Sequence, residues 1–212
     1  MAETYSQPKP NSRNLLVYMD VSNTLTNIAL GAAAFAAIFK AQTLEFAGPL
    51  RSHIVLTTFG YILMMTQSLL AVTKTSGWTR ALKHSQREKV QLVVGIMGAA
   101  LAIAGISISI TTPLVVDHEG PMSTHAIIGF TALAFTILTT LAAIIHFFLS
   151  GRTTGPIHDY CAFLNLIMAF ITFTIGLHKV YDFLTATLFS FLAILGLTFT
   201  ILNVFIGKHK MV

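Results

Sequence analysis

Six long apolar stretches alternate with short polar segments along the chain. A hydrocarbon core about 30 Å thick needs about 20 mostly apolar residues in each crossing helix, and every stretch is long enough. The pattern therefore predicts six membrane-spanning helices joined by short loops. Their expected ranges are Leu15–Phe39, His53–Val72, Val90–Pro113, Met122–Ser150, Ile157–Lys179 and Phe183–Gly207.

The first stretch is the least regular of the six. Polar residues interrupt its first half, namely Asp20, Asn23, Thr24, Thr26 and Asn27. Because such groups are costly against lipid, we expect them to face protein.

The composition agrees with a membrane environment. Hydrophobic residues make up 54% of the 212 residues and charged residues only 10%, whereas soluble domains carry roughly 25% charged residues. The expected fold is all-α, an integral membrane six-helix bundle over residues 15–207, with a polar tail over residues 1–14 and a basic tail over residues 208–212. The single cysteine, Cys161, excludes an internal disulfide and a cysteine-built metal site.

The net charge of +5 predicts an orientation. With the N-terminus on the cytosolic or insertion side, basic residues on that side outnumber those on the other, as the positive-inside rule requires. The inner set is Lys9, Arg13, Lys74, Arg80, Lys83, Arg87, Lys89, Arg152, Lys208 and Lys210, and the outer set is Lys40, Arg51 and Lys179. Both termini are then on the inner side, with the acidic loop Asp117–Glu119 on the outer side. The segment Lys74–Lys89 is basic enough to attract anionic lipid headgroups or a small anionic substrate.

Histidines are the candidate chemical groups, and their depth in the membrane separates them. His53 and His125 each lie a few residues inside an apolar stretch, near the outer face, on helices two and four. These helices cross in the same direction. Two imidazoles on one metal hold their helices farther apart than the roughly 8–10 Å of directly packed neighbours, so the two helices should be diagonal in a four-helix core. This geometry predicts a bis-histidine haem clamp with both histidines as metal ligands.

The other histidines fit a clamp less well. His146 and His158 lie near the inner face on consecutive antiparallel helices, which we expect to be in direct contact. His178 comes well after His158, about 200° farther around the helix, and so faces elsewhere. The remaining three fall in loops or the tail, where a solvated imidazole is expected: His84, His118 and His209.

Three of the helices carry motifs that resemble the cytochrome b561 family. The second helix reads HIVLTTFGYILMMTQSLL from His53, the fourth begins THAIIG at Thr124, and the fifth ends IGLHK at Lys179. The resemblance covers all six predicted helices and is to the short members without a soluble domain. It implies a six-helix membrane protein with two b-type haems in helices two to five. Such proteins typically pass electrons from cytosolic ascorbate to monodehydroascorbate or ferric iron on the other side.

The resemblance also implies roles for individual residues. Carried over by position, His53 and His125 match the ligands of the non-cytosolic haem, and His158 matches the fifth-helix ligand of the cytosolic haem. Counting back from Gly105, which matches a third-helix glycine of the family, the expected third-helix histidine falls on Gln91. Glutamine is not a usual haem ligand, so the inner haem is in doubt.

Two further positions bear on the inner site. The family has a glycine four residues after its fifth-helix histidine, and Ala162 stands there in this chain. Its methyl group removes the close backbone approach that glycine allows. Lys89 matches a position that the family uses near cytosolic ascorbate, and an ordinary inner-face lysine would fit the same position equally well.

The predicted function is electron transfer by a b-type haem, with one haem expected. A single centre near one face leaves most of a barrier of roughly 30 Å without a stepping stone. The protein is then a slow transmembrane oxidoreductase or a one-sided reductase linked to ascorbate or quinol. The alternative is a haem-poor structural or accessory subunit of a larger membrane complex. Homodimers are also compatible with the sequence, and no feature indicates nucleic acid. The donor, the acceptor and the host membrane stay open.

Overall fold

The computed structural model describes residues 10–44, 48–73, 77–111, 123–150 and 156–209. Within these ranges the regular structure is entirely helical. The helices are α1 (Pro10–Thr43), α2 (Gly48–Thr57), η1 (Thr58–Met65), α3 (Thr66–Ala71), α4 (His84–Thr111), α5 (Thr124–Ser150), α6 (Pro156–Val180) and α7 (Phe183–His209).

The structure confirms the six predicted membrane helices. Within the described ranges, six helical stretches are long and apolar enough to cross a membrane, and α2, η1 and α3 together form the second, Gly48–Ala71. This stretch starts at the Gly48-Pro49 pair, ahead of the predicted start at His53. Proline is tolerated in a first helical turn because its missing N–H would have no partner there.

His84 lies at the start of α4, so its expected position in a loop was wrong. The side-chain oxygen of Gln86 accepts a hydrogen bond from the backbone N–H of Lys83 at 3.0 Å, which is half of a capping box. One turn into the helix, the carboxylate of Glu88 lies 3.4 Å from Nδ1 of His84. The apolar pattern begins only at Val90 and therefore misses this polar first turn. His209 is likewise the last residue of α7, and His118 lies outside the described residues.

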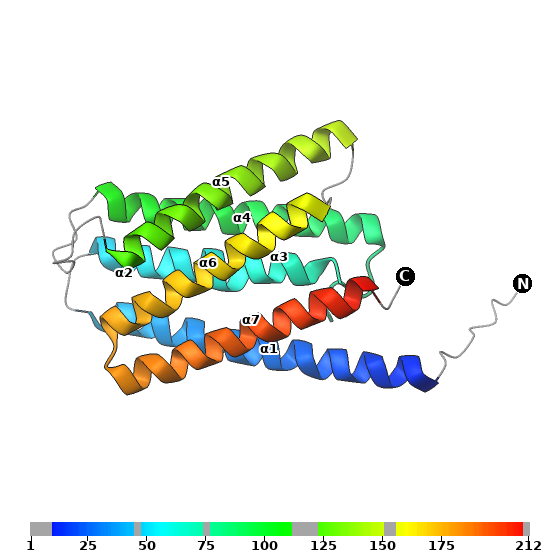
Figure 1. The fold of residues 1–212 in the computed structure, drawn as a ribbon, viewed down its shortest axis with the longest axis horizontal. Coiled ribbons are helices and arrows are strands. Elements are labelled where there is room, and N and C mark those ends of the chain that lie inside the picture. The colour runs from blue at the N-terminus through cyan, green and yellow to red at the C-terminus, as the bar shows by residue number, and fades with distance from the viewer. Residues whose placement is uncertain (1–9, 45–47, 74–76, 112–122, 151–155, 210–212) are drawn as a thin grey trace, which may run out of the picture.

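Four membrane helices form a closed ring (Figure 1). α2 packs on α4, α4 on α5, α5 on α6, and α6 on η1. The second and fourth membrane helices are therefore diagonal, and α5 and α6 are in direct contact, as predicted. α1 and α7 pack on each other and cover one side of the ring, so that α1 begins and α7 ends at the same end of the bundle.

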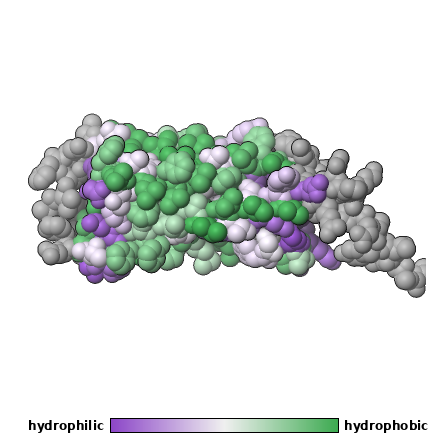
Figure 2. Space-filling view, turned by 90° about the horizontal axis from the view of Figure 1, so that it is seen from below, coloured by the Kyte–Doolittle hydropathy of each residue, from purple (hydrophilic) through white to green (hydrophobic). Residues whose placement is uncertain are grey.

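The outer surface of the bundle is apolar along its middle. Figure 2 shows a hydrophobic band between polar ends on the face that it views. Large hydrophobic side chains are exposed on several helices, among them Phe35, Phe148 and Leu188. Lipid is the solvent in which such a belt is stable. The chain is thus a multi-pass membrane protein.

Small residues allow the second and third membrane helices to approach closely. A Cβ atom added at Gly60 would come within 2.7 Å of the backbone nitrogen of Ala102 and the carbonyl oxygen of Gly98, both on α4. Ile62 and Leu70, which lie on the second membrane helix with Gly60, are fully buried in the hydrophobic core. Close backbone packing of this kind holds helices together in lipid, where burial of apolar surface gives little driving force.

A π-helix lies in the middle of the second membrane helix, and the sequence pattern did not predict it. η1 spans Thr58–Met65, between the half that carries His53 and α3. π-helical turns are rare and are frequently found at functional sites. Backbone hydrogen bonds in a π-helix join residues five apart, whereas those in an α-helix join residues four apart. The π-helix η1 therefore changes the rotation of α2 about the helix axis relative to α3.

Thr26 and Asn27 of α1 both make polar contacts with other helices, but only Thr26 is buried as expected, whereas Asn27 is exposed. Thr26 is fully buried, with its hydroxyl 3.5 Å from the amide nitrogen of Asn203 on α7. The side-chain oxygen of Asn27 accepts a hydrogen bond of 2.8 Å from the amide of Gln67 on α3. These contacts attach α1 to two other helices.

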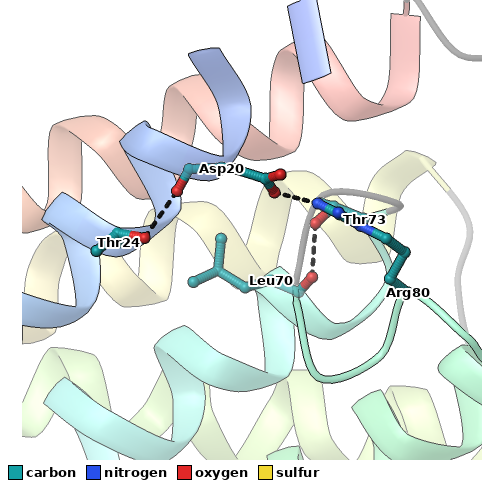
Figure 3. A network of polar contacts seen from close by, with 5 residues as sticks. All are labelled: Asp20, Thr24, Leu70, Thr73 and Arg80. Carbon is teal, nitrogen blue, oxygen red and sulfur yellow. Dashed lines mark hydrogen bonds and ion pairs between the residues drawn. The ribbon is translucent and has the colours of Figure 1, made fainter. Parts of the chain in front are cut away.

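Asp20 of α1 pairs with Arg80, which lies between α3 and α4 (Figure 3). Both side chains are nearly half exposed, so the pair contributes at most about 1 kcal/mol. Thr24 differs from the expectation, because it is exposed. Its hydroxyl donates to the carbonyl of Asp20 at 2.9 Å, which satisfies it within its own helix.

Candidate functional site

His53 is held by the third membrane helix. Its Nδ1 lies 2.9 Å from the carbonyl oxygen of Gly105 on α4. A carbonyl only accepts hydrogen bonds, so Nδ1 carries the proton in this contact. In the neutral ring the basic nitrogen is then Nε2, the form in which an imidazole binds a metal.

His125 is held in the same way by a different helix. It is the second residue of α5, and its Nδ1 lies 3.1 Å from the carbonyl oxygen of Thr172 on α6. The same reasoning assigns the proton to Nδ1 and the basic lone pair to Nε2. Such a hydrogen bond to a backbone carbonyl fixes both the tautomer and the ring orientation of metal-binding histidines.

The two rings are spaced for one metal between them. Their centroids are 6.4 Å apart and their planes are inclined by 82°. Metal–imidazole bonds are about 2.0–2.1 Å long, so two rings on opposite sides of one metal have centroids roughly 6.3 Å apart. The diagonal helices thus bring the two predicted ligands together at the separation that a bis-histidine site requires.

Gly176 leaves room beside His125, and Gly105 lets α4 approach α2 closely. A Cβ atom at Gly176 of α6 would lie 3.1 Å from Cε1 of His125, closer than side chains normally approach. A Cβ atom at Gly105 would lie 2.9 Å from Cγ2 of Thr57, one turn after His53. From the sequence, Gly105 served only to align the third helix, and Gly176 had no predicted role. The only signal for Gly176 was its place in the IGLHK motif.

The inner candidate residues are arranged differently. Gln91 is 5% exposed on α4, and its side-chain oxygen Oε1 has no hydrogen-bond partner. It lines a cavity of about 70 Å³ whose wall also contains Ala162 of α6. His158 lies in the first turn of α6, and Lys89 is exposed on α4.

Three further histidines whose side chains are described lie apart from the pair of His53 and His125. His84, His146 and His178 are exposed. The ring of His178 packs 5.8 Å from that of Phe183, so it faces away from the bundle centre. Within the described ranges, no group of three or more His, Cys, Asp or Glu side chains is placed to hold a metal ion. The pair of His53 and His125 is therefore the best-built candidate site in the part of the chain that the structure describes.

The family model of eukaryotic cytochrome b561 matches residues 52–184, which is more than half of the chain and includes both histidines. The chain belongs to the cytochrome b561 family. A comparison with curated proteins gives no match. Cytochrome b561 proteins carry b-type haem and transfer electrons at membranes, so this is a haem-binding membrane protein of electron transport.

The site of His53 and His125 fits a haem on its own geometry. Both rings have Nε2 as the basic nitrogen, and the 6.4 Å between their centroids would allow the two imidazoles to hold one haem iron. The glycine at position 176 keeps the space beside the His125 ring clear of a side chain. Haem iron is commonly held by imidazole ligands of this kind.

Proposed function

We propose that this cytochrome b561 protein binds one b-type haem between His53 and His125 and works as a reductase at the outer face of its membrane. The observation that carries the proposal is the 6.4 Å separation of two rings whose Nδ1 atoms contact carbonyls of two other helices. When bound, haem supplies one-electron oxidation and reduction.

The residues around the site have separate tasks. His53 and His125 bind the iron, while the carbonyls of Gly105 and Thr172 orient the rings and make Nε2 more basic. Burial and hydrogen bonding of the ligands both tune the reduction potential of a haem.

The inner site supports a count of one haem. Gln91 stands at the position of the expected ligand, and the adjoining cavity of about 70 Å³ is far smaller than the roughly 300–1,000 Å³ of typical cofactor sites. Ala162 lies in the same wall. Gln91 then stands where the family resemblance expects a histidine opposite His158, and electrons would have no second stepping stone across the inner half.

The proposed orientation has both termini on the cytosolic or insertion side, which sets the haem near the opposite face. This follows from the excess of basic residues at the end where α1 begins and α7 ends. We propose ascorbate or a quinol as the donor and ferric iron or monodehydroascorbate as the acceptor. Lys89, exposed on α4, is the candidate contact for an anionic donor on the inner side.

The second candidate function is a structural or accessory subunit of a larger membrane complex. The undersized inner cavity favours it, because a protein with a single haem lacks the transmembrane relay of its family. Haem at His53 and His125 would then chiefly stabilise the second and fourth membrane helices. A homodimer is a further possible assembly for either function.

The test of the ligand assignment is the visible spectrum of two single variants. His53→Ala and His125→Ala should each abolish the low-spin b-type spectrum and lower the melting temperature, since a bound cofactor stabilises the folded state. His178→Ala, which changes an exposed histidine on α6, is the matched control and should keep the wild-type spectrum. Retention of that spectrum in both His53→Ala and His125→Ala would refute the assignment.

A further inference from the structure

A small cavity, partly open at the surface of the bundle, lies in the inner half, where α3, α4, α5 and α6 meet. Its volume is about 70 Å³, and its wall carries no charged side chain. Met65 at the end of η1 also contributes to the wall. The polar members of the wall are Ser68, Gln91, Thr139, Thr140 and Asn165.

No donor of the cavity wall is hydrogen-bonded to the side-chain oxygen of Gln91. Its side chain is buried, and Oε1 has no partner. The hydroxyl of Ser68 already donates to the backbone carbonyl of Gln91 at 2.8 Å. The hydroxyl of Thr139 donates to the carbonyl of Phe135 at 2.7 Å, and the amide of Asn165 donates to Thr136 at 3.0 Å. A buried acceptor without a donor is costly, so a molecule in the cavity is the natural partner.

The volume decides which molecule fits. A cavity needs at least about 10–15 Å³ to hold one water molecule, and an apolar cavity of about 150 Å³ takes up benzene. At about 70 Å³ the cavity is too small for an aromatic ring and large enough for several water molecules. We propose that this cavity binds a cluster of ordered water molecules, one of which donates to Oε1 of Gln91.

The water would extend an existing polar chain. Asn165 in the wall is hydrogen-bonded to Thr136 of α5, and the Thr136 hydroxyl lies 2.9 Å from the hydroxyl of Tyr61 on η1. These three side chains are buried in the middle of the bundle. Together with the water, they form a hydrogen-bonded path from the inner half of the membrane to η1. The inner half of this protein is therefore hydrated at the level where Gln91 replaces the expected ligand.

Radiolytic footprinting tests this proposal on the full-length protein in detergent or lipid. Hydroxyl radicals formed from bound water oxidise adjacent side chains, and Met65 in the cavity wall is the reporter. Met19 of α1, 2% exposed and outside the wall, is the internal reference. Gln91→Leu removes the water's acceptor at similar side-chain volume and should lower the oxidation rate of Met65 several-fold while leaving that of Met19 unchanged.

A second variant guards against misfolding of the first. Ala143→Val fills the cavity from α5 without touching Gln91 and should lower Met65 oxidation in the same way. Equal Met65 oxidation in the wild type and in both variants would overturn the proposal. The outcome does not depend on the outer haem, because Met65 labelling is measured by mass spectrometry. The visible spectrum, which reports on His53 and His125, should be the same in all three proteins.

Discussion

His53 and His125 differ from the other described histidines in what holds their rings. Each Nδ1 contacts a carbonyl on a neighbouring helix, whereas His84, His146 and His178 are exposed. The sequence predicted that these two histidines lie together, because depth and crossing direction can be counted along the chain. It could not supply Gly105 and Thr172 as carbonyl partners, since these depend on the rotation of α4 and α6.

Gly176→Ala tests the space beside His125. The new methyl carbon would lie 3.1 Å from Cε1 of the ring, so the ring must move by a few tenths of an ångström. A side chain pushed off its preferred rotamer costs about 0.5–1.5 kcal/mol, which corresponds to a roughly two- to tenfold loss of haem affinity. Haem titration of the apoprotein measures this loss.

Gly31→Ala is the control for this prediction. No heavy atom lies within 4 Å of a Cβ atom added at Gly31, so haem affinity should stay at the wild-type value. An equal affinity in Gly176→Ala and Gly31→Ala would show that position 176 does not border the haem site.

Gln91→His tests the inner site. The new imidazole would restore the missing ligand type opposite α6, but a cavity of about 70 Å³ is too small for the macrocycle, and packed cores resist added volume. We expect only a partial gain of a second haem in Gln91→His and a larger gain in Gln91→His with Ala162→Gly. The haem-to-protein ratio of each purified variant measures this. A full second haem already present in wild type would contradict the proposed role of Gln91.

At the scale of helices, the length of each apolar stretch predicted a membrane helix, because the thickness of the hydrocarbon core sets the length that a crossing helix needs. Each of the six predicted stretches overlaps a membrane-length helix in the described part of the chain. The π-helix η1 could not be predicted in this way, since its signal is a shift in backbone hydrogen bonding and not in hydropathy. The start of α4 at His84 was missed because its first turn is polar and is stabilised by Gln86.

The start of α7 offers a test at this scale. The carboxylate of Asp182 accepts a hydrogen bond of 3.0 Å from the backbone N–H of Thr185, which holds the pKa of Asp182 below its usual value. This stabilisation is present above the usual pKa of an aspartate and is lost as the pH falls through the lowered pKa. Asp182→Ala should slightly lower the melting temperature at neutral pH.

Asp182→Asn is the matched variant, because asparagine caps helices about as well as aspartate. It should keep the melting temperature near the wild-type value at neutral pH and weaken its dependence on acid pH. Thermal unfolding followed by circular dichroism at several pH values measures both effects. A larger drop in Asp182→Asn than in Asp182→Ala would contradict the capping role.

For the whole molecule, the sidedness of charge predicts which end of the bundle faces the cytosol. Ser85 lies at the start of α4, at the end where α1 begins, and Leu184 lies at the start of α7, at the other end. In a Cys161→Ser background, Ser85→Cys should react with a membrane-impermeant maleimide once the plasma membrane is opened. Leu184→Cys should gain no reactivity in that step. The reverse pattern would place the His53 and His125 site on the cytosolic side.

The whole-molecule account rests on one haem at the outer pair and water in the inner half. Its most direct test is the haem-to-protein ratio of the purified wild-type chain, measured together with its reduced-minus-oxidised visible spectrum. We predict one haem per chain and a single low-spin b-type species, because among the histidines whose side chains the structure describes only His53 and His125 are spaced to hold it. A ratio of two would contradict the account by requiring a second haem beside Gln91, and a ratio of zero would contradict it by leaving the outer pair without its cofactor.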